Sequence, residues 1–261
     1  MFRRKRAVAI IQARMRSTRF PGKVLELIEG KTSIQHIVER VRMAKSVDDV
    51  IVATSRASAD KKIVEYCRDE LGVVAIQGSE NNVIDRVLKA AEFIGADIIV
   101  DITGDCPLVD PEHIEALTRA VKKKGYDYAS NIVPRKWPDG FDVQVYGTKL
   151  LEMAYLLIEN PAHYSHVGWN IVNQAMTLTL MNGDKLDVFS YPPDDGKDYS
   201  YLEVTLDEPA DLKLISALIQ RHEEKATGRI MSADDVIYYL EHDPDLMKIN
   251  RDVKRKVPGE G

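Results

Sequence analysis

The sequence lacks the features of a secreted or membrane-embedded chain. Its 261 residues include only two cysteines, Cys67 and Cys106, which form neither a CxxC pair nor a disulfide framework. This usage fits a reducing compartment, so we expect a cytoplasmic protein. Because no apolar run approaches the ~20 residues that a helix needs to cross a bilayer, we also expect no membrane span.

The sequence also lacks an excess of positive charge. It has 36 Lys and Arg residues against 41 Asp and Glu, which gives a formal net charge of -5. General nucleic-acid binding needs the opposite balance, so we expect no nucleic-acid partner. The hydrophobic fraction of 44% is typical of a globular chain, and the length suffices for one large domain.

Strand-like and helix-like segments alternate through the first half of the chain. Short apolar runs predict buried strands at 7–13, 49–55, 73–78 and 96–105. Each run precedes a segment with helical spacing of its apolar residues, and these helices are expected at 33–45, 59–72, 81–95 and 110–125. Four such units predict an α/β, Rossmann-like fold, in which helices flank a mainly parallel mixed sheet.

The alternation breaks after residue 130, where prolines become frequent. The remaining pattern predicts a loop with a short strand, then two helices, two strands and two helices, at 131–147, 148–159, 163–174, 184–192, 199–207, 209–225 and 232–242. We therefore expect a single domain over residues 1–261, with a smaller inserted lobe at about 131–200 that serves acceptor binding or dimerisation.

A dense group of basic residues follows the first predicted strand. The segment ARMRSTRFPGK, residues 13–23, has three arginines and Lys23 but no acidic residue. Such side chains neutralise phosphate oxygens, and the Pro-Gly pair lets the backbone turn close to a ligand. The spacing of neither a Walker A loop nor a GxGxxG fingerprint is present. The loop indicates a triphosphate site of another kind, although its composition equally allows a solvated basic loop without a ligand.

Two aspartates are expected at the same edge of the sheet. Asp105 follows the fourth strand in TGDCPLVDP, and Asp207 follows a late strand in TLDEPADL. Ligands of an open parallel sheet bind beyond the carboxyl ends of its strands, and Mg²⁺ usually takes two carboxylates together with phosphate oxygens and waters. Each aspartate alone also fits a helix N-cap, as Asp110 does. The pair beside the basic loop favours a magnesium site.

These stretches together resemble the cytidylyltransferase family that includes the CMP-Kdo and CMP-sialic acid synthetases. The resemblance is greatest to the branch of the spore-coat polysaccharide biosynthesis protein F. The matching motifs run in the family's order and are ARMRSTRFPGK, GSENNVIDR (78–86), TGDCPLVDP (103–111), DGFDVQVY (139–146) and TLDEPADLKLI (205–215).

The resemblance implies transfer of CMP from CTP to a sugar acid or related anionic acceptor, in surface polysaccharide or glycoconjugate biosynthesis. A carboxylate or similar oxygen of the acceptor attacks the α-phosphorus, and pyrophosphate leaves. Mg²⁺ is the implied cofactor, and a homodimer is the implied assembly. The implied residues are Lys23, Arg19 and Asp105 for catalysis; Asp105 and Asp207 for Mg²⁺; Ala13, Arg14, Ser17, Gly22, Lys23, Arg86 and Gly104 for the nucleotide; and Asp142, Gln144 and His166 for the acceptor.

The acceptor side departs from this branch, which leaves alternatives open. Gln144 stands where an acidic residue is usual, and the Arg-Glu pair that usually precedes His166 is absent. Asp142 binds an acceptor hydroxyl or stabilises the turn near Trp137, and Trp137 is an acceptor platform or a packing residue. A glycosyltransferase using a nucleotide sugar is an alternative function, although DITGD (101–105) has the wrong spacing for its D-x-D metal site. A non-catalytic nucleotide-binding protein of the same pathway is another.

Overall fold

A computed structural model describes residues 4–160, 163–164, 167–168, 170–171, 185–225 and 228–253. Its centre is a seven-stranded sheet in the order β5-β4-β1-β6-β8-β7-β9. Within the described chain, β8 runs antiparallel to both of its neighbours and the other pairings are parallel. The strands are β1 (Ala7–Gln12), β4 (Asp49–Ser55), β5 (Val74–Gly78), β6 (Ile98–Thr103), β7 (Tyr128–Ser130), β8 (Gln144–Gly147) and β9 (Val188–Ser190).

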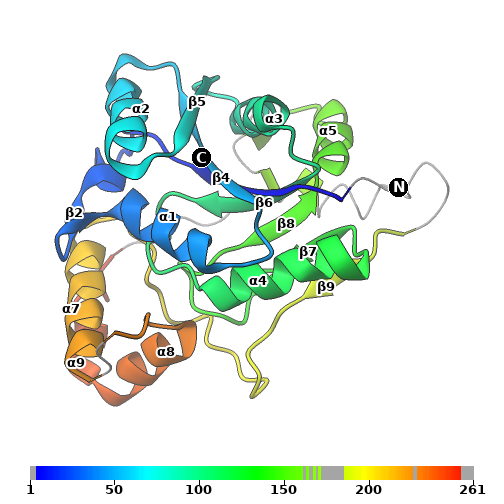
Figure 1. The fold of residues 1–261 in the computed structure, drawn as a ribbon. Coiled ribbons are helices and arrows are strands. Elements are labelled where there is room, and N and C mark those ends of the chain that lie inside the picture. Colours follow the sequence, from blue (N-terminus) through cyan, green and yellow to red (C-terminus); the bar gives the residue numbers. More distant parts are fainter. Residues whose placement is uncertain are drawn as a thin grey trace.

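Helices cover both faces of this sheet, as Figure 1 shows. Alternate residues of each strand point to opposite faces, so that Ala7, Ala9 and Ile11 of β1 pack on one side while Val8 and Ile10 pack on the other. The first side is covered by α1 (Ser33–Met43), α2 (Lys61–Tyr66) and α4 (Pro111–Arg119), and the second by α3 (Val83–Ile94) and α5 (Thr148–Leu156). The expected α/β fold with a mainly parallel mixed sheet is confirmed.

A third apolar core lies beside the sheet. It joins buried residues of the 137–141 and 202–206 segments to α7 (Pro209–Lys225), α8 (Ala233–His242) and α9 (Pro244–Lys248). Figure 1 shows these helices together at one end of the molecule. A two-stranded ribbon of β2 (Leu27–Ile28) and β3 (Lys31–Thr32) contributes Ile28 to the same core. This core places the 202–207 segment against the end of the sheet that carries the site.

Side-chain caps set several helix starts. Thr32 and Asn82 accept hydrogen bonds from the backbone N–H groups of Gln35 and Asp85. Asp110 accepts from the N–H of Glu112, with proline at the first helical position, so it is the N-cap that the sequence indicated.

One predicted strand is wrong. Residues 199–207 form no strand in the described chain, and a single bridge joins Glu203 to Asp139. The apolar alternation that suggested a strand reflects burial of Leu202, Val204 and Leu206 against the third core. Their backbone groups bond to loops instead, with the N–H of Leu206 donating to the carbonyl of Asp105 at 2.8 Å.

The predictions for residues 128–200 are met only in part. Residues 128–130, which the sequence did not mark, form β7. β8 and β9 lie within the stretch 131–200 but belong to the main sheet, and residues 172–184 lie outside the described residues. The inserted lobe and the single-domain division therefore stay predictions.

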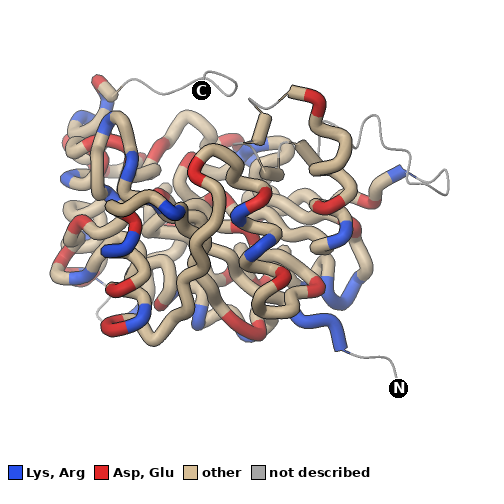
Figure 2. The backbone as a smooth tube through the Cα atoms, turned by 90° about the horizontal axis from the view of Figure 1, so that it is seen from above, with Lys and Arg blue, Asp and Glu red and all other residues tan. Residues whose placement is uncertain are grey.

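Charge is spread over the molecule rather than gathered on one face. Seen from above in Figure 2, acidic and basic residues intersperse along most of the chain. The cationic loop after β1 is thus a local feature of a chain with net charge -5. In the described residues, no helix has the length and apolar character that crossing a membrane requires.

Candidate active site

The site lies where the order of the parallel strands reverses. From β1 the chain builds β4 and β5 on one side, and then places β6 on the other side of β1. Such a switch point opens a crevice at the carboxyl ends of the two central strands. The basic loop follows β1, and the TGDCP loop follows β6.

The two loops touch at Gly104. Its N–H donates to the carbonyl oxygen of Gln12 at 2.8 Å, and a Cβ atom on residue 104 would lie only 2.7 Å from that same oxygen. A side chain would therefore push the two strand ends apart. The glycine of TGDCP is required because this approach leaves no room for a methyl group.

Two contacts fold the basic loop. Gly22 has a φ angle of 80°, in the left-handed region, and its N–H donates to the carbonyl of Met15 at 2.8 Å. The carboxylate of Asp60 accepts from the N–H of Met15 at 2.7 Å and from the N–H of Ser55 at 3.1 Å. Asp60 is fully buried, and it ties the start of the loop to the end of β4.

Asp60 is a site residue that sequence reasoning missed. Its one sequence signal is an aspartate at the start of a helix, which ordinarily indicates an N-cap. Here the side chain makes no cap hydrogen bond in its helix and reaches across to the loop instead.

The ammonium group of Lys23 lies between two segments that are far from it in the sequence, those of Asp105 and Asp207. Its Nζ lies 2.9 Å from Oδ2 of Asp105 and 2.8 Å from Oδ1 of Asp207. Arg19 places Nη2 2.5 Å from the other oxygen of Asp207 and Nη1 3.8 Å from Glu208. The structure therefore brings together the residues expected to act in catalysis and in metal binding, although Asp207 follows an irregular segment rather than a strand.

These charges hold one another ionised. Burial alone would lower the pKa of Lys23, but the carboxylates of Asp105 and Asp207 raise it above its ordinary value of 10.5. Burial likewise opposes ionisation of Asp105, but the charge and hydrogen bond of Lys23 outweigh it and hold the pKa of Asp105 below its ordinary value of 3.8. At neutral pH the ammonium of Lys23 is charged and the carboxyl of Asp105 is ionised.

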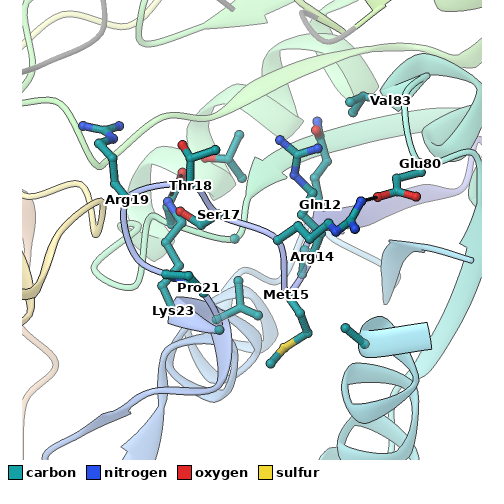
Figure 3. A pocket seen from close by; sticks show the side chains of 18 of the residues that line it. Gln12, Arg14, Met15, Ser17, Thr18, Arg19, Pro21, Lys23, Glu80 and Val83 are labelled. Carbon is teal, nitrogen blue, oxygen red and sulfur yellow. Dashed lines mark hydrogen bonds and ion pairs between the residues drawn. The ribbon is translucent and has the colours of Figure 1, made fainter. Parts of the chain in front are cut away.

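The convergence forms one wall of a cavity of about 1060 Å³, drawn in Figure 3. Its size is in the upper range of ligand pockets. Every residue expected to serve catalysis, the nucleotide or Mg²⁺ lines it; they are Ala13, Arg14, Ser17, Arg19, Gly22, Lys23, Arg86, Gly104, Asp105 and Asp207. Their individual roles stay predictions.

Two arginines attach to the opposite wall. Arg86 is buried, and its Nη1 donates to the carbonyls of Ser79 at 2.8 Å and Glu80 at 3.3 Å. Burial lowers its pKa, and the charge of Arg14 adds to this. Arg16, which had no expected role, pairs with Glu80 at 2.5 Å from an exposed position. Arg86 thus shapes the 79–80 wall, and Arg16 links that wall to the basic loop.

Two of the residues expected to bind the acceptor, Asp142 and Gln144, lie apart from the cavity lining. Asp142 accepts two hydrogen bonds from Arg135, at 2.6 and 2.7 Å, which is the turn-stabilising alternative. Gln144 accepts from the hydroxyl of Tyr128 at 2.6 Å. Trp137 is buried and donates to the carbonyl of Tyr191, so it is a packing residue. His166 lies outside the described residues, and acceptor binding by this group stays a prediction.

Comparisons with known proteins agree with the fold and the loop. Residues 8–136 match the family model described as cytidylyltransferase. An uncharacterised protein of Methanocaldococcus jannaschii is 32% identical over 95% of this chain and 96% of its own. The spore coat polysaccharide biosynthesis protein SpsF of Bacillus subtilis is 30% identical over 90% of this chain and 94% of its own. The chain belongs to the cytidylyltransferase family.

Solved structures place this cytidylyltransferase among enzymes of the same architecture. A cytidylyltransferase from Leptospira borgpetersenii superposes with a TM-score of 0.81 and 26% identity, over 97% of this chain and 99% of that one. A CMP:2-keto-3-deoxy-manno-octonic acid synthetase complexed with CTP superposes with a TM-score of 0.61 over 84% of this chain and 100% of that one. At 20% identity, the second comparison shows the fold alone. The family resemblance noted in the sequence is confirmed.

The carboxylates of this cytidylyltransferase fit a divalent cation only as part of a larger ligand set. In the described residues, no group of three His, Cys, Asp or Glu side chains could hold a metal ion. Asp105 and Asp207 do face a single positive charge from two sides. That arrangement suits Mg²⁺, which keeps several waters and takes one or two carboxylates together with substrate phosphates.

Proposed function

We propose that this cytidylyltransferase transfers CMP from CTP to a sugar acid or related anionic acceptor and releases pyrophosphate in a Mg²⁺-dependent reaction. The observation that supports this most is the convergence of Lys23 and Arg19 on Asp105 and Asp207 at the wall of one large cavity. Cations for a triphosphate and carboxylates for its metal are the groups that this chemistry needs. A surface polysaccharide or glycoconjugate pathway, a cytoplasmic location and a homodimer complete the proposal.

The reaction places most of its demands on positioning and charge. An acceptor oxygen forms a bond to the α-phosphorus, the bond to the bridging oxygen breaks, and its electron pair leaves with pyrophosphate. Arg14 and Ser17 hold the nucleoside part, while Arg19 and Lys23 hold the phosphates. Since two carboxylates already fix the ammonium of Lys23, its charge needs little reorganisation to stabilise the leaving pyrophosphate. Asp105 and Asp207 would hold Mg²⁺, which when bound neutralises phosphate oxygens.

The acceptor class rests on relatives rather than on contacts. A 3-deoxy-manno-octulosonate cytidylyltransferase of Geobacter sulfurreducens is 43% identical over 41% of this chain and 42% of its own. The segment beyond the cavity carries the Arg135–Asp142 pair, and Arg135 also lies 3.2 Å from Asp139. Both carboxylates are therefore held by Arg135, and they do not define the acceptor.

The test is a pyrophosphate-release assay with CTP, Mg²⁺ and a panel of sugar acids. We expect release with CTP in the presence of at least one acceptor, and loss of release when EDTA removes the metal. Binding of CTP without turnover on any acceptor would instead identify a nucleotide-binding protein. Sugar transfer from a nucleotide sugar without pyrophosphate would identify a glycosyltransferase.

A further inference from the structure

A buried hydrogen-bond chain begins at the floor of the cavity. Gln12, the last residue of β1, donates from its side-chain Nε2 to Oδ1 of Asp101 on β6. The hydroxyl of Tyr146 on β8 donates to the other oxygen of Asp101 at 2.8 Å. Asp101 is 3% exposed, and both of its oxygens are occupied by neutral donors. These hydrogen bonds therefore link the cavity to the middle of the sheet.

Asp101 fixes which end of the Gln12 amide faces the cavity. Burial raises the pKa of Asp101 to about 6, against the hydrogen bonds from Gln12 and Tyr146, so the carboxylate is largely ionised at neutral pH. An ionised carboxylate only accepts hydrogen bonds, and the NH₂ group of Gln12 must therefore turn toward it. The oxygen Oε1 then turns away. In the described part of the chain no donor bonds to this oxygen, and Gln12 lines the cavity.

The position of Gln12 matches the middle of a bound nucleotide. In Figure 3 it lies between Lys23 and Arg19 on one side and Glu80 and Val83 on the other. A nucleoside triphosphate is a linear sequence of phosphates, ribose and base. If its phosphates reach Lys23 and its base reaches Val83, its ribose lies over the end of β1.

We propose that Oε1 of Gln12 accepts a hydrogen bond from a ribose hydroxyl of the nucleotide, and that Asp101 is the positioning residue that presents this oxygen. The inference rests on the proposed function and deepens it, because it makes the enzyme select for a nucleotide that carries this ribose hydroxyl over the analogue that lacks it. The selectivity comes from the Oε1 atom of Gln12, whose orientation the buried carboxylate of Asp101 sets before the nucleotide binds.

The experiment measures binding rather than turnover, by calorimetry with Mg²⁺ and without an acceptor. The probes are CTP, 2′-deoxy-CTP, 3′-deoxy-CTP and UTP, and the proteins are the wild type and Gln12→Leu. One deoxy analogue should bind the wild type about fivefold more weakly than CTP, the value of one neutral hydrogen bond. In Gln12→Leu this ratio should fall below about twofold, with the ratio of CTP to UTP unchanged.

Each ratio compares two ligands on the same protein, so partial unfolding of a variant cancels. The inference is overturned if both deoxy analogues bind the wild type as tightly as CTP. It is also overturned if the preference survives in Gln12→Leu, or if that variant changes the CTP to UTP ratio instead. Failure of the wild type to bind any nucleotide would overturn the proposed function itself, whereas a surviving preference overturns only the role of Gln12.

Two further variants test the part played by Asp101. In Asp101→Asn the amide offers one acceptor oxygen and one NH₂ group in place of two acceptor oxygens, so Gln12 no longer has to turn its NH₂ group toward residue 101 and its oxygen can turn inward. The ribose preference should then fall toward the value in Gln12→Leu. In Tyr146→Phe the pairing of Asp101 with Gln12 remains, and the preference should stay within about twofold of the wild type. An unchanged preference in Asp101→Asn would contradict the positioning role.

Discussion

Lys23 and Asp105 are 82 residues apart in the sequence, yet Nζ of one lies 2.9 Å from Oδ2 of the other. The contact joins the loop after β1 to the loop after β6, and Asp207 adds a third segment at 2.8 Å. One buried ammonium therefore organises the end of the sheet before any ligand arrives. Its removal tests both the site and the proposed chemistry.

Lys23→Met should lower the rate of pyrophosphate release by about 100- to 1,000-fold, the usual effect of removing one preorganised donor to developing charge. It also leaves two carboxylates facing each other, so the apo-protein should lose stability at neutral pH. Lys31→Met is the matched control, because Lys31 pairs with Glu39 at the surface and away from the cavity. Turnover near the wild-type rate in Lys23→Met would contradict the assignment.

Gly104→Ala should lower the free energy of unfolding by about 1–3 kcal/mol, because the new methyl group would overlap the carbonyl of Gln12. The strand ends must separate to relieve the contact, so the affinity for CTP should fall as well. Gly147→Ala is the control, since the nearest atom to its Cβ lies 4.0 Å away. Urea unfolding and CTP titration of both variants measure the difference. Equal stability of the two variants would show that the close contact between residue 104 and the carbonyl of Gln12 does not require a glycine.

The sequence contained much of this architecture in local patterns. The bounds of β4 and of α7 are those predicted, because a short, mostly apolar run and a long helical pattern that begins at a proline are local signals. The basic loop was recognisable because its four cations, Arg14, Arg16, Arg19 and Lys23, lie within ten residues of one another. Local signals also explain the error at 199–207, where burial against helices gives the same alternation as pairing in a sheet.

The rest of the site depends on contacts between distant residues. Asp60 is 45 residues from the backbone group that it holds, and Gln12 is 89 residues from Asp101. No spacing rule connects such pairs, since each partner alone has an ordinary local interpretation. The acceptor side was the least predictable, because no local sequence signal shows that Asp142 pairs with Arg135.

Asp60→Asn should destabilise the protein by about 1–3 kcal/mol, because an amide has one acceptor oxygen where the carboxylate uses two. The NH₂ group then faces a backbone or hydroxyl donor without a partner, and the loop loses its anchor at Met15. The affinity for CTP should fall together with stability. Glu65→Gln, at an exposed position on α2, is the control and should stay within about 0.5 kcal/mol of the wild type. Unchanged CTP binding in Asp60→Asn would show that the loop is held by other contacts.

The buried carboxyl of Asp101 should make stability depend on pH in a direction opposite to that of a salt-bridged aspartate. Burial raises its pKa from 3.8 to about 6, so the folded state binds this proton more tightly than the unfolded state does. Its contribution is therefore fully present below pH 4 and is lost as the pH rises through 6. A rise of about two in the pKa corresponds to a difference of about 3 kcal/mol in the free energy of unfolding.

Asp101→Asn removes this titration and leaves the other carboxyls in place. The stability of the wild type relative to Asp101→Asn should therefore fall by about 2–3 kcal/mol between pH 4 and pH 7, as measured by urea unfolding. Asp69→Asn is a control of opposite sign, because a hydrogen bond from Arg68 lowers the pKa of Asp69 and its contribution is lost as the pH falls. Parallel pH profiles for the wild type and Asp101→Asn would mean that Asp101 does not titrate as a buried acid.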